Sequence, residues 1–210
     1  MTVQEAAPRL SRAFFRRDPV AVARGLLGHR LVSRIGGKRT SGIIVETEAY
    51  LGIDDKGAHT YGGRRTPRNE TMWGDGGHVY VYFVYGMHHC VNVVAGRSGD
   101  PVAVLIRALE PDLSDPTDAS HRLMFARRLK AKRPTNLCSG PSKLSQALGI
   151  TRDQNGEDLV EGDVLFIERA RTRSLPAGSI ISGPRIGIGY AEEWQHEPLR
   201  FLLKGNPHVS

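Results

Sequence analysis

Two glutamates in the segment VETEAY, residues 45–50, have a spacing that suits acid–base chemistry. The surrounding run is β-branched and alternates in polarity, which predicts a strand over residues 43–50. Side chains two residues apart on a strand share a face, so Glu46, Glu48 and Tyr50 point the same way, with the carboxylates about 6–7 Å apart. Such a pair can supply a general acid or base. By itself the segment fits a polar, solvent-facing side of an antiparallel sheet better.

A long glycine-rich segment, residues 52–70, follows this strand and changes that balance. Its sequence is GIDDKGAHTYGGRRTPRNE, and long loops without regular structure are often functional. The segment carries His59 and then Arg64, Thr66 and Arg68. Glycines beside arginines suit a backbone that closes on phosphates. A histidine on its own is more often an ordinary surface residue.

Three of the six tyrosines lie in HVYVYFVYGM, residues 78–87. Alternation along a strand places Tyr80 and Tyr82 on one face, with Val81 and Phe83 on the other and expected in the core. The dipeptide Tyr85-Gly86 reads as the tip of a hairpin that leads into a strand around residue 92. Tyrosines make good stacking platforms for bases, and an aromatic side chain at a hairpin tip can act as a wedge between base pairs.

A single arginine interrupts the apolar segment PVAVLIRALEP, residues 101–111. Arg107 shares a predicted strand face with Ala103 and Leu105, where an unpaired charge is costly. We therefore expect a carboxylate or a phosphate near Arg107. The alternative is a structural ion pair with Glu46 or Glu110.

Patterns for metal and nucleotide cofactors do not fit. The run His88-His89-Cys90 places neighbouring ligands on opposite strand faces, which is poor chelation geometry. The sequence has neither GxxxxGK[ST] nor GxGxxG, and it has no serine nucleophile elbow or zinc-deaminase motif. We expect no metal and no cofactor.

The elements that must position these residues predict an α+β fold. Proline at a first turn and glycine at a stop predict helices over residues 19–27 and 141–148, and a third reads from about 119 to 131. Strands are expected over residues 43–50, 79–85, 90–94 and 102–109, with another around 164–167. We predict one domain, residues 1–210: a mixed, mostly antiparallel sheet with flanking helices, a protruding hairpin and a flexible tail over residues 1–10.

Composition excludes some classes of protein and favours a nucleic-acid partner. The 210 residues include 40% hydrophobic residues and two cysteines, and no apolar run is long enough for a membrane helix. The N-terminus lacks the apolar core of a secretory signal, so a cytoplasmic location is expected. The net charge is +7, which favours a polyanionic partner. Basic residues gather in residues 1–40 and 119–152, which suggests a shared positive face.

Taken together, the motifs resemble those of the alkyladenine (3-methyladenine) DNA glycosylases of the vertebrate type. The resemblance implies that this chain is a bacterial member of that family. The resemblance runs in order from about Arg16 to Ser210, which is nearly the whole chain. It implies an enzyme that excises alkylated or deaminated purines from duplex DNA by flipping them out, without metal and without lyase chemistry. The segments that carry it are VETEAYLG, AHTYGGRRTPRN, YVYFVYGM, VNVV, RALEP, LCSGPSKL and PLRF…GNP.

By this resemblance, each matching residue takes a role in base excision. Glu48 is the general base, and Arg107 lies near the catalytic water and the target nucleotide's phosphate. Tyr50 and Tyr82 sandwich the flipped base, with His59 in the same pocket.

The resemblance also assigns residues that contact DNA or select the base. Asn92 excludes normal guanine by a clash with its amino group. Tyr85 intercalates at the hairpin tip, next to Met87. The residues expected at the DNA backbone are Arg64, Thr66 and Arg68. A monomer acting on damaged DNA at the bacterial nucleoid is the expected form.

Two other functions stay open at this point. A non-catalytic nucleic-acid-binding module would use the tyrosines only for stacking, and a carbohydrate glycosidase would use Glu46 and Glu48 on sugars. The DNA glycosylase hypothesis requires the Glu48 carboxyl to reach a solvent-filled cavity that the tyrosines also line.

Overall fold

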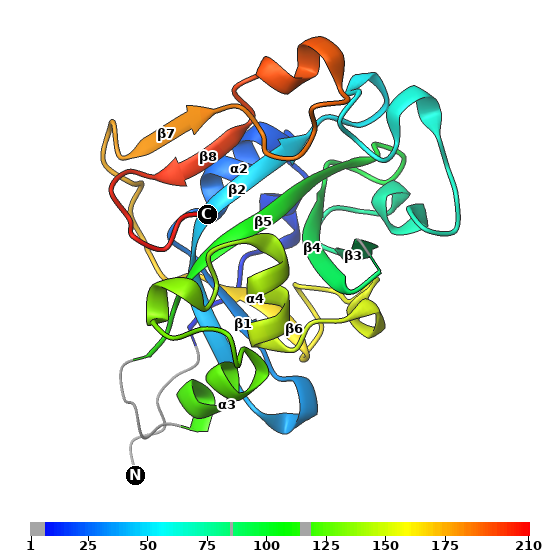
Figure 1. Ribbon diagram of the computed structural model, residues 1–210. Coiled ribbons are helices and arrows are strands. Elements are labelled where there is room, and N and C mark those ends of the chain that lie inside the picture. Colours follow the sequence, from blue (N-terminus) through cyan, green and yellow to red (C-terminus); the bar gives the residue numbers. More distant parts are fainter. Residues whose placement is uncertain (1–6, 85, 114–118) are drawn as a thin grey trace.

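One antiparallel sheet organises the chain in the computed structural model, which describes residues 7–84, 86–113 and 119–210 (Figure 1). The strand order is β3-β4-β5-β2-β1-β6, with β8 pairing to β2 and β7 pairing to β8. Every pairing between these named strands is antiparallel, as expected for an α+β fold. The strands are β1 (Arg30–Ser33), β2 (Thr40–Tyr50), β3 (Val79–Val84), β4 (His88–Ala95), β5 (Val102–Pro111), β6 (Leu165–Glu168), β7 (Ile180–Gly183) and β8 (Arg200–Leu203).

The α-helices of the described residues are α1 (Arg12–Phe15), α2 (Pro19–Leu26), α3 (Ala119–Arg127) and α4 (Pro141–Leu148). The predicted start of α2 is confirmed, because the Asp18 side chain accepts hydrogen bonds from the backbone N–H groups of Val20 and Ala21. The prediction that α3 continues to residue 131 is wrong. The chain turns after Arg127, since Ala131 N–H bonds to the Arg128 carbonyl and Pro134 lies shortly beyond.

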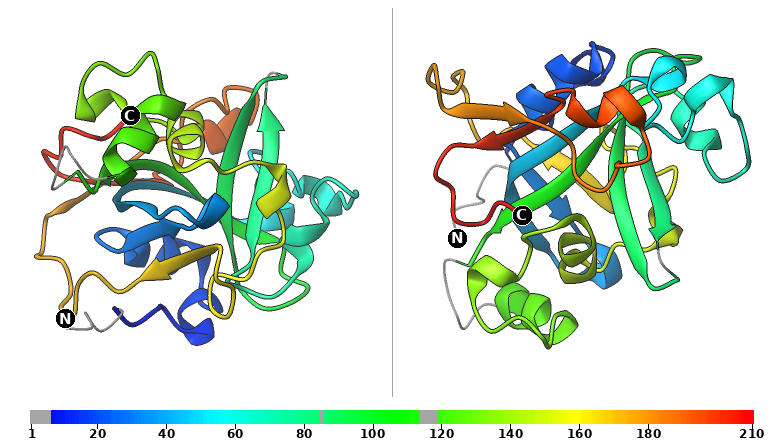
Figure 2. Two further views of the ribbon diagram at one scale, coloured as in Figure 1. Left: turned by 90° about the horizontal axis from the view of Figure 1, so that it is seen from below. Right: turned by 45° about the horizontal axis from the view of Figure 1, so that its top comes forward.

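Helices α2 and α4 cover opposite sides of the central strands. In the left view of Figure 2, blue α2 lies on one side of the sheet and yellow-green α4 on the other. The Thr47 hydroxyl donates to the Ala23 carbonyl of α2, so the odd-numbered side chains in this part of β2 face that helix. Glu46 and Glu48 consequently point to the other side of the sheet, where α4 packs against β4 and β5.

The pairing between β2 and β5 is irregular at the glutamates. The register shifts on both sides of Glu46, which pairs with Ala108, while Thr47 pairs with Ile106. Arg107 therefore lies opposite the step between Glu46 and Thr47. Such bulges re-aim side chains and are common beside active sites.

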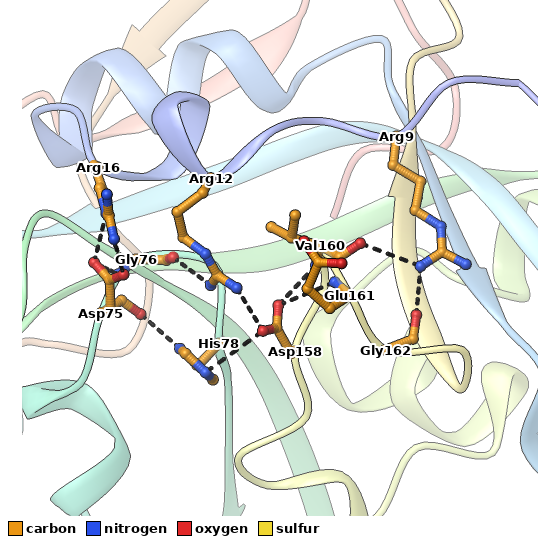
Figure 3. Close-up of polar contacts among 10 residues, drawn as sticks. All are labelled: Arg9, Arg12, Arg16, Asp75, Gly76, His78, Asp158, Val160, Glu161 and Gly162. Carbon is orange, nitrogen blue, oxygen red and sulfur yellow. Dashed lines mark hydrogen bonds and ion pairs between the residues drawn. The ribbon is translucent and has the colours of Figure 1, made fainter.

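Arginines of the N-terminal segment join two distant loops, as Figure 3 shows. Arg16 pairs with Asp75 at 2.6 Å, Arg12 pairs with Asp158, and Arg9 pairs with Asp163 at 2.9 Å. The predicted positive face over residues 1–40 is wrong for these three residues, because nearby carboxylates neutralise them.

The prediction of a flexible tail over residues 1–10 is wrong for residues 8–10. Leu10 is buried at 2% exposure, and its N–H bonds to the Ile167 carbonyl of β6. Arg9 forms a β-bridge to Glu168. The segment from Pro8 onward is thus held by backbone hydrogen bonds, and residues 1–6 lie outside the described residues.

Candidate active site

A cavity of about 530 Å³ lies over the face of the sheet that β3, β4 and β5 form beside the end of β2, and the loops that follow β2 and β7 also line it. Its volume lies in the range of ligand-binding pockets. The residues predicted for catalysis and base binding that line it are Tyr50, His59, Tyr82, Asn92 and Arg107. The structure therefore brings together side chains from five stretches of sequence: β2, the loop that follows it, β3, β4 and β5.

Glu48 lies directly behind this cavity and is fully buried. Its Oε1 accepts from the Ile186 N–H at 2.7 Å and lies 3.2 Å from Arg107 Nη1, and its Oε2 accepts from the Tyr50 hydroxyl at 2.9 Å. These three groups, rather than the carboxylate, belong to residues that line the cavity. The expectation that the Glu48 carboxyl itself reaches the cavity is therefore wrong, because these contacts cover it. Water from the cavity must displace one of them to reach Glu48.

Burial sets the protonation behaviour of Glu48. Loss of hydration raises the pKa of this carboxyl above its ordinary value, although Arg107, the Ile186 N–H and the Tyr50 hydroxyl each act to lower it. A carboxylate of raised pKa, held by donors beside a cavity, has the character of a general base.

Glu46 is not a solvent-facing residue, and the interpretation of this strand face as an exposed polar surface is wrong. The side chain is fully buried and pairs with Arg107 Nε at 3.0 Å and Arg200 Nη1 at 3.1 Å. The expectation that Arg107 needs a carboxylate partner is confirmed, because it contacts both glutamates. Arg107 is itself only 6% exposed.

Tyr50 is backed by a buried ion pair that the sequence did not indicate. The Arg185 guanidinium lies 4.7 Å from the Tyr50 ring centre and forms a two-point pair with Asp55, at 2.5 and 2.8 Å. Both side chains of this pair are fully buried. Asp55 also accepts from the N–H groups of Leu51 and Gly57. The pair fixes the Tyr50 ring and, through the next residue, the Ile186 N–H that holds Glu48.

The tyrosines of β3 form an aromatic wall with His59. Tyr82 lies 4.5 Å from the His59 ring, edge to face, and Tyr80 Oη lies 2.8 Å from His59 Nδ1. Burial, with smaller contributions from Arg68 and Arg64, lowers the pKa of His59 to about 4. His59 is therefore neutral at physiological pH and can exchange hydrogen bonds with a neutral ligand.

Asn92 projects into the cavity from β4, opposite Tyr80 in the hairpin register. Its amide nitrogen donates to the Tyr80 carbonyl at 3.1 Å, and the residue is 3% exposed. A side chain fixed in this way contributes shape to the cavity.

A second groove, of about 400 Å³, shares His59 and Arg68 with the cavity and contains the predicted backbone-contacting residues. Arg64 and Thr66 line this groove. The buried Asn69 shapes it by donating to the carbonyls of His59 and Arg64 and accepting from the Thr66 N–H. Arg68 also lies 5.7 Å from the Tyr82 ring centre.

Strands β3 and β4 form the predicted hairpin, whose tip includes Met87. Met87 is 69% exposed there, while Tyr85 lies outside the described residues. Phe83 is 42% exposed and lines the cavity, so the prediction that it is a core residue is wrong. Its position near the end of the hairpin takes it beyond the helices that cover the strands.

The segment Gly183–Tyr190 contributes to the cavity and was missed by sequence reasoning. Ile186, Gly187, Ile188 and Tyr190 line one side. The sequence GPRIGIGY has the same mixture of glycine and arginine that singled out residues 52–70, so the signal was present.

Within the described ranges, no group of three or more His, Cys, Asp or Glu side chains could hold a metal ion. No described helix is long and apolar enough to cross a membrane.

The chain is similar to known proteins along nearly its whole length. Residues 13–207 match the family described as methylpurine-DNA glycosylase (MPG). A protein of Clostridium acetobutylicum is 48% identical over 204 residues, covering 96% of this chain and 97% of its own length. A protein of Desulfitobacterium hafniense is 48% identical over 203 residues, covering 96% and 98%. Each carries the provisional name 3-methyladenine DNA glycosylase.

These matches decide between the alternatives left by the sequence. A non-catalytic binding module and a carbohydrate glycosidase both disagree with a family match that spans nearly the whole chain. The predicted resemblance is confirmed. The chain belongs to the methylpurine-DNA glycosylase family and is a DNA glycosylase for alkylated bases, a hydrolase of N-glycosyl bonds.

Proposed function

We propose that the enzyme flips alkylated or deaminated purines, of the 3-methyladenine, 7-methylguanine and hypoxanthine type, out of duplex DNA and into the 530 Å³ cavity. The N-glycosyl bond of a stacked base is out of reach, so the nucleotide must rotate outward, at a cost of a few kcal/mol. Tyr85 fills the gap that the nucleotide leaves, Met87 contacts the DNA beside it, and Arg64, Thr66 and Arg68 hold the backbone. The enzyme acts as a monomer at the nucleoid and begins base-excision repair.

The observation that carries this proposal is the meeting of Tyr50, Tyr82, His59 and Asn92 in one cavity directly in front of Glu48. Tyr50 and Tyr82 stack on the flipped base. A cationic alkylated purine gains about 0.5–2 kcal/mol of cation–π attraction that a normal purine lacks. The fixed Asn92 excludes the exocyclic amino group of guanine.

Hydrolysis proceeds with water as the nucleophile and without a covalent enzyme intermediate. Positive charge develops on the sugar as the purine leaves, and the Glu48 carboxylate stabilises it. Glu48 then takes a proton from the water that attacks C1′. The Tyr50–Glu48 hydrogen bond opens in this step, because Glu48 has no exposed surface and Tyr50 lies between it and the water of the cavity. Arg107 lies beside Glu48 and the target phosphate.

The test is a panel of duplexes that each contain one 3-methyladenine, 7-methylguanine, hypoxanthine or normal purine. The expected result is release of free base from the damaged duplexes, without strand cleavage until alkali is added. Affinity for the duplex should fall steeply with salt, by about one log unit of slope per phosphate contact. Absence of release from every lesion would contradict the proposal, and strand cleavage without alkali would contradict its monofunctional mechanism.

A further inference from the structure

The buried Glu46 carboxylate and the exposed Ser210 together hold Arg107, and neither residue lines the cavity. The Glu46 carboxylate has no exposed surface, and it accepts from Arg107 Nε at 3.0 Å and from Arg200 Nη1 at 3.1 Å. Its other oxygen accepts from the Ser210 N–H at 2.6 Å. Two cations and an amide therefore share one carboxylate, which holds that side chain in a single orientation.

Ser210 contacts both members of the pair that it supports. Its N–H donates to Glu46, and its hydroxyl accepts from Arg107 Nη2 at 3.0 Å. The Arg107 guanidinium is thus held at Nε by Glu46 and at Nη2 by Ser210. The remaining nitrogen, Nη1, is the one that lies 3.2 Å from Glu48 Oε1.

We propose that Glu46 and Ser210 are positioning residues that aim Arg107 at Glu48 and the reacting nucleotide. The inference rests on the proposed function of Glu48 and Arg107. Both residues act through Arg107, since neither lines the cavity. A planar guanidinium fixed at two nitrogens has its third nitrogen fixed as well, which is why this support reaches the carboxylate.

The acid side of the pH–rate profile is a readout that a merely structural role would not move. The charged or titratable groups that act on Glu48 are Glu46 and Tyr50 of β2, Arg107 of β5, Tyr82 of β3, Cys90 of β4 and Arg185 of the 183–190 segment. Arg107 lowers the pKa of Glu48, and Glu46 raises it. An Arg107 guanidinium displaced from Glu48 lowers the pKa of Glu48 less, so the acid side of the profile moves to higher pH. Loss of the Glu46 charge alone lowers the pKa of Glu48 and moves the acid side to lower pH.

Ser210→Ala is the cleanest test, because Ser210 is exposed and the change removes one hydroxyl and no charge. We expect single-turnover base release from a hypoxanthine duplex to slow about 2- to 10-fold, as for the loss of one hydrogen bond. Duplex affinity and melting temperature should stay at wild-type values, and the acid side of the profile should move to higher pH. Ser210→Thr, which keeps the hydroxyl, should restore the rate.

Ser179→Ala is the matched control, since that hydroxyl donates to the carbonyl of Pro176 in the same turn. Glu46→Gln provides a second measurement. It removes the charge that raises the pKa of Glu48, and it loosens Arg107, whose charge lowers that pKa. Movement of its acid limb to higher pH supports positioning, and movement to lower pH overturns it. A Ser210→Ala rate equal to wild type overturns this inference alone, whereas no base release by wild type overturns the proposed function together with it.

Discussion

Glu48→Gln is expected to slow single-turnover release of an alkylated purine by about 10²- to 10⁴-fold, the usual contribution of a general base. Glutamine has the same shape, and its amide oxygen can still accept from the Ile186 N–H. It cannot take a proton from water. Binding to a lesion-containing duplex should therefore change little, and the measurement is the rate at saturating enzyme beside the dissociation constant.

Glu110→Gln is the matched control for this prediction, because Glu110 is an exposed carboxylate on the neighbouring strand β5. Its rate should equal that of wild type. The wild-type rate should also fall on the acid side at a pH above the ordinary range of a glutamate, because burial raises the pKa of Glu48 and the protonated form is not a base. Full activity of Glu48→Gln would remove Glu48 from the mechanism.

Asp55→Asn is expected to lower the free energy of unfolding by about 3–5 kcal/mol, the usual cost of leaving a buried charge without its partner. Arg185 would keep its charge at a site that has no exposed surface. The loss should appear as a lower midpoint in urea denaturation with an unchanged slope. Replacing both residues, as Asp55→Leu with Arg185→Met, should recover part of the loss because no charge then stays buried.

Lys56→Met is the control for Asp55→Asn. Lys56 pairs with Glu192 and Glu193 in the same loop region, but at the surface, where ion pairs contribute little. We expect no measurable change in its unfolding midpoint. Equal midpoints for Asp55→Asn and Lys56→Met would mean that the Asp55–Arg185 pair does not support the cavity wall.

The parts of the fold with strong local signals were predictable. Helices α2 and α4 carry a proline at the first turn and a glycine after the last, and the long strands lie in runs rich in β-branched, aromatic and other apolar residues. The short strands β1, β7 and β8 have four residues each and were missed. They form because neighbouring strands complete their hydrogen bonds, which is a tertiary effect that no four-residue pattern reveals.

The site divides in the same way. Glu46, Glu48 and Tyr50 follow from strand periodicity, and the need of Arg107 for a carboxylate follows from the cost of burying a charge. The burial of the two glutamates did not follow, because their partners in β8 and Ser210 lie 150 or more positions along the chain. The pairing of Arg12 and Arg16 with distant carboxylates was hidden for the same reason, so net charge overstated the basic surface.

The most direct test of the central claim is a crystal structure of the Glu48→Gln protein bound to a duplex with one hypoxanthine. The account predicts that the purine lies in the 530 Å³ cavity, between the rings of Tyr50 and Tyr82, with C1′ facing residue 48. It also predicts that the Tyr50 hydroxyl has left residue 48 to make room for water. A hypoxanthine still stacked in the helix, or held in the outer groove by Arg64 and Thr66, would contradict the account.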